Sequence, residues 1–166
     1  MSPRIVDLPD KRIWLRVAEA SWSDPLSPHC SRESGGRWNP PGSHATLYLN
    51  GDIFTAKLQI DRMLAGFPVD ADDLDAGSYV LVAATLPRSQ QCADAVTPGG
   101  LLALRLPDTY PADSHGRQLG HATCQPIGAQ LRQQRLRGVW CRSAATASGK
   151  GRELAWFPAT RRSTAV

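Results

Sequence analysis

The chain has 166 residues, of which 42% are hydrophobic and 20% are charged, and its net charge is +4. This length predicts a single domain, residues 1–166, with a sizeable core. No apolar run approaches the roughly 18 residues that a membrane span requires, and the N-terminus lacks the apolar centre of a signal peptide, so we expect a cytoplasmic protein without a membrane partner.

The beginning of the chain predicts a strand followed by a long loop. Within residues 10–20, Ile13, Leu15 and Val17 occupy alternate positions. That spacing is typical of a strand with one buried face, which these three side chains would form. Residues 21–36 are rich in Ser, Pro and Gly, so we expect a loop there.

A short strand and a helix are predicted next. Residues 45–49 have the sequence Ala-Thr-Leu-Tyr-Leu, which favours a strand. Asp52 suits a helix N-cap, and the apolar residues that follow it at helical spacing predict a helix over residues 52–65. Gly66 would end this helix.

The second half of the chain predicts further strands and one helix, and the whole pattern favours an α+β domain with a mixed sheet. Residues 79–86 are almost continuously apolar, which is typical of a fully buried strand. The remaining predicted elements are a turn at 98–100, a helix over 126–135 that Pro126 begins, and strands at 138–141 and 154–157.

The segment Gly-Gly-Arg-Trp-Asn-Pro-Pro-Gly at residues 35–42 places a cation on a tightly turning loop. Its first two glycines tolerate positive φ and a close approach of the backbone to a ligand, and Pro40 and Pro41 stiffen the loop. A planar guanidinium on such a loop suits bidentate recognition of phosphate or carboxylate. The alternative interpretation of Arg37 is an exposed side chain on a turn between strands.

Positive charge is concentrated in the C-terminal third, which favours an anionic partner such as nucleic acid, a nucleotide phosphate or an acidic protein. Aromatic residues do not interleave with these cations as a surface for single-stranded nucleic acid requires, so a solvated basic face is the competing interpretation. The cations are Arg132, Arg135, Arg137, Arg142, Lys150, Arg152, Arg161 and Arg162.

The four cysteines include no Cys-x-x-Cys pair, and we expect reduced thiols. Two sequence pairs, His29-Cys30 and His121-x-x-Cys124, contain residue types that bind zinc. Their spacing is unlike that of the usual zinc-binding motifs, so we predict no metal site.

Several motifs together resemble the RES domain family over residues 14–158. The segment 35–42, followed by Leu47-Tyr48-Leu49 and a helix, is similar to the first half of that family. Three later segments resemble the closing motif of the family. They are Ile127-Gly128, Gly-Val-Trp-Cys-Arg-Ser-Ala at 138–144, and Glu-Leu-Ala-Trp-Phe at 153–157. The resemblance implies a compact, ADP-ribosyltransferase-like α+β domain whose mixed, largely antiparallel sheet is flanked by a few helices.

The resemblance also implies a function. RES proteins act as toxins of bacterial RES–Xre toxin–antitoxin pairs and consume NAD, either degrading it as glycohydrolases or phosphorylases or transferring ADP-ribose to a protein. NAD would be the substrate, without a metal. The implied partners are an Xre-type antitoxin and, for transfer, a target protein, with nucleic acid bound only through the antitoxin.

The family is named for an Arg, a Glu and a Ser, and the resemblance assigns these roles to particular residues. The Arg is Arg37, the Ser is Ser143, and the pocket tyrosine is Tyr48. The family's Glu lies eleven residues after that tyrosine, where this chain has Gln59. Arg37, Gln59 and Ser143 are therefore the candidate catalytic residues, and the candidates for binding NAD are Arg37, Tyr48, Ser143 and Arg16.

The chemistry of NAD gives these residues physical roles. Cleavage of the bond between nicotinamide and ribose creates positive charge on the ribose, as in glycoside hydrolysis. An arginine suits the diphosphate, an aromatic ring suits stacking, and Ser143 would bind the carboxamide or brace Arg37. Without the family, Tyr48 is a core aromatic, Ser143 a turn residue and Arg16 an exposed strand residue.

The absence of a carboxylate at position 59 leaves the activity open. Gln59 keeps the shape of Glu but not its charge, so we expect a rate about ten- to several-hundred-fold below that of a Glu-containing relative, with NAD binding kept. Asp61 would lie on another face of the helix and Asp52 would cap it, so Glu33 on the expected loop is the more credible substitute. The competing hypotheses are an inactive NAD-binding module and a basic nucleic-acid-binding protein.

Overall fold

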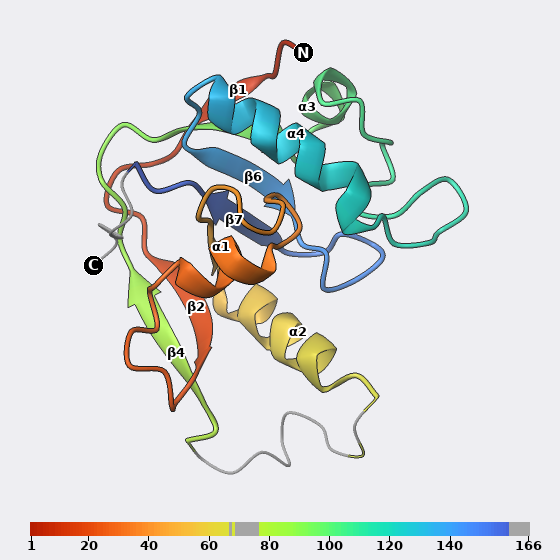
Figure 1. The fold of residues 1–166 in the computed structure, drawn as a ribbon. Helices are drawn as coiled ribbons and strands as arrows, with labels where there is room; N and C mark the ends of the chain where they lie inside the picture. The colour runs from red at the N-terminus through yellow and green to blue at the C-terminus, as the bar shows by residue number, and fades with distance from the viewer. Residues whose placement is uncertain (67, 69–76, 160–166) are drawn as a thin grey trace.

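A mixed β-sheet of seven strands forms the centre of the part of the chain that the computed structural model describes, residues 1–66, 68 and 77–159 (Figure 1). The strand order is β1-β5-β6-β7-β3-β2-β4, with β5 and β6 parallel and the other neighbours antiparallel. This confirms the predicted α+β class with a mixed, largely antiparallel sheet. The strands are β1 (Ile5–Asp7), β2 (Trp14–Glu19), β3 (Leu47–Asn50), β4 (Tyr79–Ala84), β5 (Gln91–Ala95), β6 (Gly138–Arg142) and β7 (Arg152–Trp156).

Four helices flank the sheet within the described residues. Two of them, α3 and α4, pack on β5 and β6, and α2 packs on β2 and β3 (Figure 1). None of the described helices is long and apolar enough to cross a membrane. The helices are α1 (His29–Ser34), α2 (Ile53–Leu64), α3 (Pro98–Ala103) and α4 (His121–Gln133).

The hydrophobic core is divided by the sheet because successive strand side chains point to opposite faces. On strand β7, Leu154 and Trp156 belong to one cluster, whereas Ala155 belongs to the other. The second cluster, which contains Ala155, includes Leu101 of α3 and Leu131 of α4, so these helices cover that face.

The predicted helix 52–65 is confirmed as α2, and its N-cap is Asp52 as expected. The Asp52 carboxylate accepts hydrogen bonds of 2.7 Å from Thr55 N and 2.8 Å from Thr55 Oγ1. The strands predicted at 45–49, 138–141 and 154–157 correspond to β3, β6 and β7 within two residues at each end. Local signals were sufficient for these elements.

The predicted buried face of the first long strand is only partly correct. Ile13 is 60% exposed and precedes β2, whereas Trp14 is only 1% exposed. The reason is an aromatic contact, since the ring of Trp14 meets the ring of Trp140 edge to face with centroids 5.4 Å apart. Val17 is buried as expected.

The strand predicted over 79–86 is present as β4, but it is not buried on both faces. It lies at the edge of the sheet and pairs only with β2. Val80 and Leu81, whose side chains point to opposite faces of the sheet, are 39% and 45% exposed.

Three other predictions are wrong, two of them because helices of six residues replace an expected loop and an expected turn. The expected loop 21–36 contains α1, and the expected turn 98–100 is the first turn of α3. Pro126 does not begin α4 but lies inside it. In α3 the proline is at the start of the helix, where no backbone N–H is needed, and Thr97 is the N-cap.

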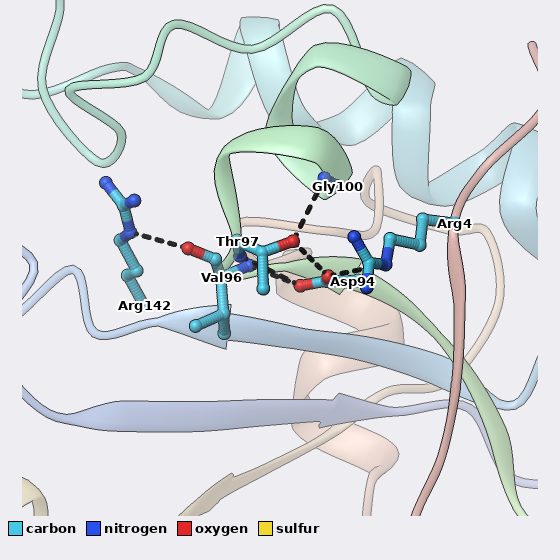
Figure 2. Close-up of polar contacts among 6 residues, drawn as sticks. All are labelled: Arg4, Asp94, Val96, Thr97, Gly100 and Arg142. Atoms are coloured by element: carbon cyan, nitrogen blue, oxygen red, sulfur yellow. Dashed lines mark hydrogen bonds and ion pairs between the residues drawn. The ribbon is translucent and has the colours of Figure 1, made fainter.

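Asp94, at the end of β5, organises the start of α3 (Figure 2). Its carboxylate accepts hydrogen bonds from Val96 N at 2.8 Å, Thr97 N at 3.1 Å and Thr97 Oγ1 at 2.5 Å, and Arg4 lies 3.7 Å away. Thr97 Oγ1 in turn caps Gly100 N. Burial opposes ionisation of Asp94, but these hydrogen bonds and the Arg4 charge outweigh it and hold the pKa below its ordinary value.

Candidate functional site

A pocket of about 320 Å³ lies between α2 and the first residue of α4, above strands β3 and β7. Figure 1 shows α1 and α2 in front of the sheet, with α4 above them. The segments that line the pocket come from all parts of the chain. Its lining residues are Ser31, Gly35, Gly36, Arg37, Tyr48, Leu49, Asn50, Gln59, Arg62, Met63, His121, Ala145 and Glu153.

The Gly-Gly-Arg-Trp-Asn loop is shaped by Tyr48. Its phenolic oxygen accepts a hydrogen bond of 2.9 Å from Trp38 N and donates one of 2.7 Å to Asn39 Oδ1. A Cβ at position 36 would lie 2.5 Å from that oxygen, so only glycine fits there. Tyr48 lines the pocket, and its hydroxyl is engaged in these two hydrogen bonds with the loop.

Arg37 is not an exposed turn residue. Its side chain is held against the protein, only 8% of the residue is exposed, and its guanidinium donates a hydrogen bond of 2.7 Å to Leu119 O, at the segment before α4. One edge of the guanidinium is thereby fixed. The residue also lines the pocket.

Gln59 lies on the α2 side of the pocket and is tied to strand β3. Its Oε1 accepts a hydrogen bond of 2.9 Å from Asn50 Nδ2. Asn50 is buried and pairs with Glu153 across the β3–β7 ladder. The amide at position 59 is therefore positioned by a residue that also neighbours a carboxylate.

Glu153 is the acidic residue among the described residues that line the pocket, and sequence reasoning assigned it no role. Ser143, which is fully buried, donates a hydrogen bond of 2.5 Å from its hydroxyl to Glu153 Oε1. Burial raises the pKa of Glu153 above its ordinary value, although the Ser143 hydroxyl and the Arg37 guanidinium act in the opposite direction. The signal in the sequence was a Glu directly before the apolar run at residues 154–157.

One cation and one histidine of the pocket were also missed. Arg62 of α2 donates hydrogen bonds of 2.7 Å to Ala144 O and 3.3 Å to Gln118 Oε1. His121 begins α4, and burial together with Arg37 and Arg62 lowers its pKa. The pocket thus combines two guanidinium groups with one carboxylate, a balance that favours an anionic ligand with a centre of developing positive charge.

The structure brings Arg37, Tyr48 and Gln59 together in the pocket wall, whereas Ser143 reaches it through Glu153. Arg16 is not among the lining residues. It lies on β2, donates a hydrogen bond of 3.1 Å to Ser27 O and stacks on the ring of Trp22 at 5.4 Å.

The other acids considered near position 59 lie outside the pocket lining. Asp52 caps α2, and Glu33 forms an ion pair of 3.1 Å with His29 on α1. Asp61 is exposed on α2.

The residues considered for zinc lie on different helices, His29-Cys30 on α1 and His121 with Cys124 on α4. A search of the described residues finds no group of three or more His, Cys, Asp or Glu side chains that could hold a metal ion. The four cysteines are free thiols.

Part of the C-terminal positive charge stabilises the fold. Arg142 donates hydrogen bonds to three backbone carbonyl groups, at 3.0 Å to Val96, 2.6 Å to Asp108 and 3.1 Å to Tyr110. Figure 2 shows the first of these contacts. Arg152 likewise donates to Gly151 O at 2.6 Å. Arg161 and Arg162 lie outside the described residues.

Comparisons with known proteins agree on the fold. The family model of the RES domain matches residues 12–165. A chain in the crystal structure of the MbcT–MbcA toxin–antitoxin complex of M. tuberculosis has the same fold, with a TM-score of 0.72 and 22% sequence identity over 92% of this chain and 75% of that one. A search of curated proteins returns no match.

Proposed function

This chain belongs to the RES domain family, and from that premise we propose that it is the toxin of a bacterial toxin–antitoxin pair that binds and consumes NAD. The observation that carries the proposal is the convergence of Arg37, Tyr48 and Glu153 in one pocket. Arg37 suits the anionic diphosphate of NAD, Tyr48 suits the aromatic nicotinamide ring, and Glu153 suits the ribose on which positive charge develops. The inactive NAD-binding module is the second candidate, because position 59 is Gln.

The cations of the pocket suit the diphosphate of NAD. Arg37 uses one nitrogen to bind Leu119 O, which fixes the plane of its guanidinium before a ligand arrives. Arg62 is held in a similar way by Ala144 O. Guanidinium groups fixed in this manner lose little conformational entropy when they bind phosphate oxygens.

The aromatic wall of the pocket suits the nicotinamide ring. Since the Tyr48 hydroxyl already bonds to Trp38 N and Asn39, its ring is locked in one orientation. A rigid ring offers stacking area at low entropic cost. Tyr48 therefore contributes a surface to the proposed site, and its hydroxyl keeps the loop in shape.

In the proposed reaction, the bond between nicotinamide N1 and ribose C1′ breaks and both electrons leave with nicotinamide, which becomes neutral. The electron-poor C1′ then accepts an oxygen of water or phosphate, or a side-chain nucleophile of a target protein, whose proton passes to solvent. In this proposal a carboxylate of the pocket stabilises the positive charge that develops on the ribose.

The antitoxin follows from the same proposal. The neighbouring structure is a toxin in a complex with its antitoxin. We infer an Xre-type partner that covers the pocket and provides any contact with nucleic acid, in the cytoplasm where NAD is available. The cationic pocket would favour an acidic segment of that partner.

The proposal is tested by mass spectrometry of NAD and its products after incubation with the purified protein, with and without phosphate. ADP-ribose, its 1-phosphate or a modified protein would identify the acceptor. Arg37→Ala should weaken NAD binding at least about tenfold, whereas Arg88→Ala, at an exposed loop position, should not. NAD binding without any product would favour the inactive module, and neither binding nor product would refute both.

A further inference from the structure

We propose that Glu153, on strand β7, is the carboxylate that stabilises the positive charge on the ribose of NAD, so that activity does not require a carboxylate at position 59. This inference rests on the proposed function. Under this inference Gln59 is not the remnant of a lost catalytic group, but a neutral neighbour of the catalytic carboxylate of Glu153.

The sheet register places the two positions beside each other. Asn50 of β3 pairs directly with Glu153 of β7, and directly opposed residues of an antiparallel pair project from the same face. The Asn50 side chain donates to Gln59 Oε1 at 2.9 Å. Asn50 therefore links the helix position to the strand position, and both Gln59 and Glu153 line the same cavity.

The carboxylate of Glu153 is fixed in one position by buried hydrogen bonds, as a group that stabilises developing charge has to be. Its Oε1 accepts the 2.5 Å hydrogen bond from Ser143, and Ser143 Oγ is fixed in turn by a 3.1 Å hydrogen bond from Ala145 N. Ser143 is fully buried, so solvent does not compete for this contact. A carboxylate fixed by buried donors needs little reorganisation when charge develops near it.

Burial is the largest influence on Glu153 and raises its pKa above the ordinary value. The Ser143 hydroxyl, Arg37, the backbone N–H of Ala144 and Arg62 act in the opposite direction and favour the ionised form that the role requires. The two guanidinium groups lie on the loop before β3 and on α2. Their positive charges offset the negative charge of Glu153, while the hydrogen bond to its carboxylate comes from Ser143.

In this assignment Glu153 forms no bond and transfers no proton. While C1′–N1 breaks and the electron pair leaves with nicotinamide, the carboxylate stabilises the ribose cation through its charge. Gln59 contributes an amide that Asn50 orients. A second carboxylate at position 59 would be a like charge close to Glu153 and would favour protonation of one of the pair.

Four chains distinguish the two positions: wild type, Glu153→Gln, Gln59→Glu and the double variant. Nicotinamide release and NAD affinity are measured for each. We expect Glu153→Gln to lower kcat by about ten- to several-hundred-fold while the Kd for NAD changes less than about threefold. Gln59→Glu should give no gain, and the double variant should recover part of the lost rate.

The matched control is Asp61→Asn, which removes an exposed carboxylate of α2 outside the pocket and should keep the wild-type rate. Wild-type turnover that survives Glu153→Gln would overturn the inference and leave the proposed function intact. A rate increase in Gln59→Glu alone would also overturn it, and this variant decides the matter if Glu153→Gln does not fold. Absence of turnover in all four chains would refute the proposed function itself.

Discussion

Gly128 of α4 lies so close to the backbone of Trp38 that a Cβ at position 128 would be 1.8 Å from the Trp38 carbonyl oxygen. The helix can therefore approach the Gly-Gly-Arg-Trp-Asn loop only without a side chain at this position. Gln125, one turn earlier, donates a hydrogen bond of 3.0 Å to Gly36 O on the same loop. This contact explains why an Ile-Gly pair far along the chain accompanies the loop motif.

We predict that Gly128→Ala destabilises the protein by about 3 kcal/mol or more, because the clash is with backbone, which cannot rotate away. Urea unfolding would measure the change. Gly99→Ala is the matched control, since the added Cβ would meet only the flexible end of Arg4, at 3.3 Å. Equal stability of the two variants would show that the helix and loop do not meet as described.

A second glycine substitution should act on binding. A Cβ at position 36 would press on the Tyr48 hydroxyl, so we predict that Gly36→Ala displaces the loop and lowers NAD affinity at least about tenfold. Calorimetric titration with NAD would measure the affinity. Wild-type affinity in Gly36→Ala would contradict the role assigned to the Tyr48 contact.

The stability of the fold should fall in mild acid through His44. Burial and the charge of Arg132 lower its pKa to about 4, and its ring meets Phe157 edge to face at 4.7 Å. A histidine with a lowered folded-state pKa contributes stability above its unfolded pKa of about 6.5, and this is lost as pH falls toward the folded value.

For the wild type we therefore expect a loss on the order of 1–2 kcal/mol between pH 7 and pH 5 from this group. His44→Gln should show a flatter profile over that range. Urea unfolding of both proteins at the two pH values makes the comparison. Parallel profiles would show that His44 is not held neutral by the fold.

Asp94 is a carboxylate whose pKa is lowered in the folded state, so its ionised form, unlike that of His44, is the form that stabilises the fold. Asp94→Ala removes the hydrogen bonds from Val96 and Thr97 and should cost about 1–3 kcal/mol at pH 7. The difference from wild type should shrink as pH falls below about 4 through the folded-state pKa. Thermal unfolding would measure it, with the exposed Asp108→Ala as the control that should change little.

Elements set by neighbouring residues were predictable from the sequence. The helix α2 has both its cap, Asp52, and its apolar spacing within one segment. By contrast, α1 and α3 are six residues each, too short for a periodic pattern, and β5 consists of Gln, Cys, Ala and Asp residues without the β-branched side chains that mark a strand.

The part of the candidate site that lies in a continuous sequence motif was predictable. Arg37, Tyr48 and position 59 follow one another within residues 37–59, and the structure places all three in the pocket wall. The role of Glu153 depends on the register that pairs it with Asn50, a contact between strands distant in sequence. No local pattern encodes such a register. The sequence therefore shows that residue 153 is a Glu, but not that its side chain lies beside Asn50 at the pocket.

The most direct measurement is the release of nicotinamide from NAD by the purified wild-type chain without its antitoxin, followed over time beside Glu153→Gln. We predict many turnovers by the wild type, with nicotinamide formed in the amount of NAD lost, and a rate at least about tenfold lower in the variant. No nicotinamide from the wild-type chain would contradict an NAD-consuming pocket, and equal rates in both would contradict the role of Glu153.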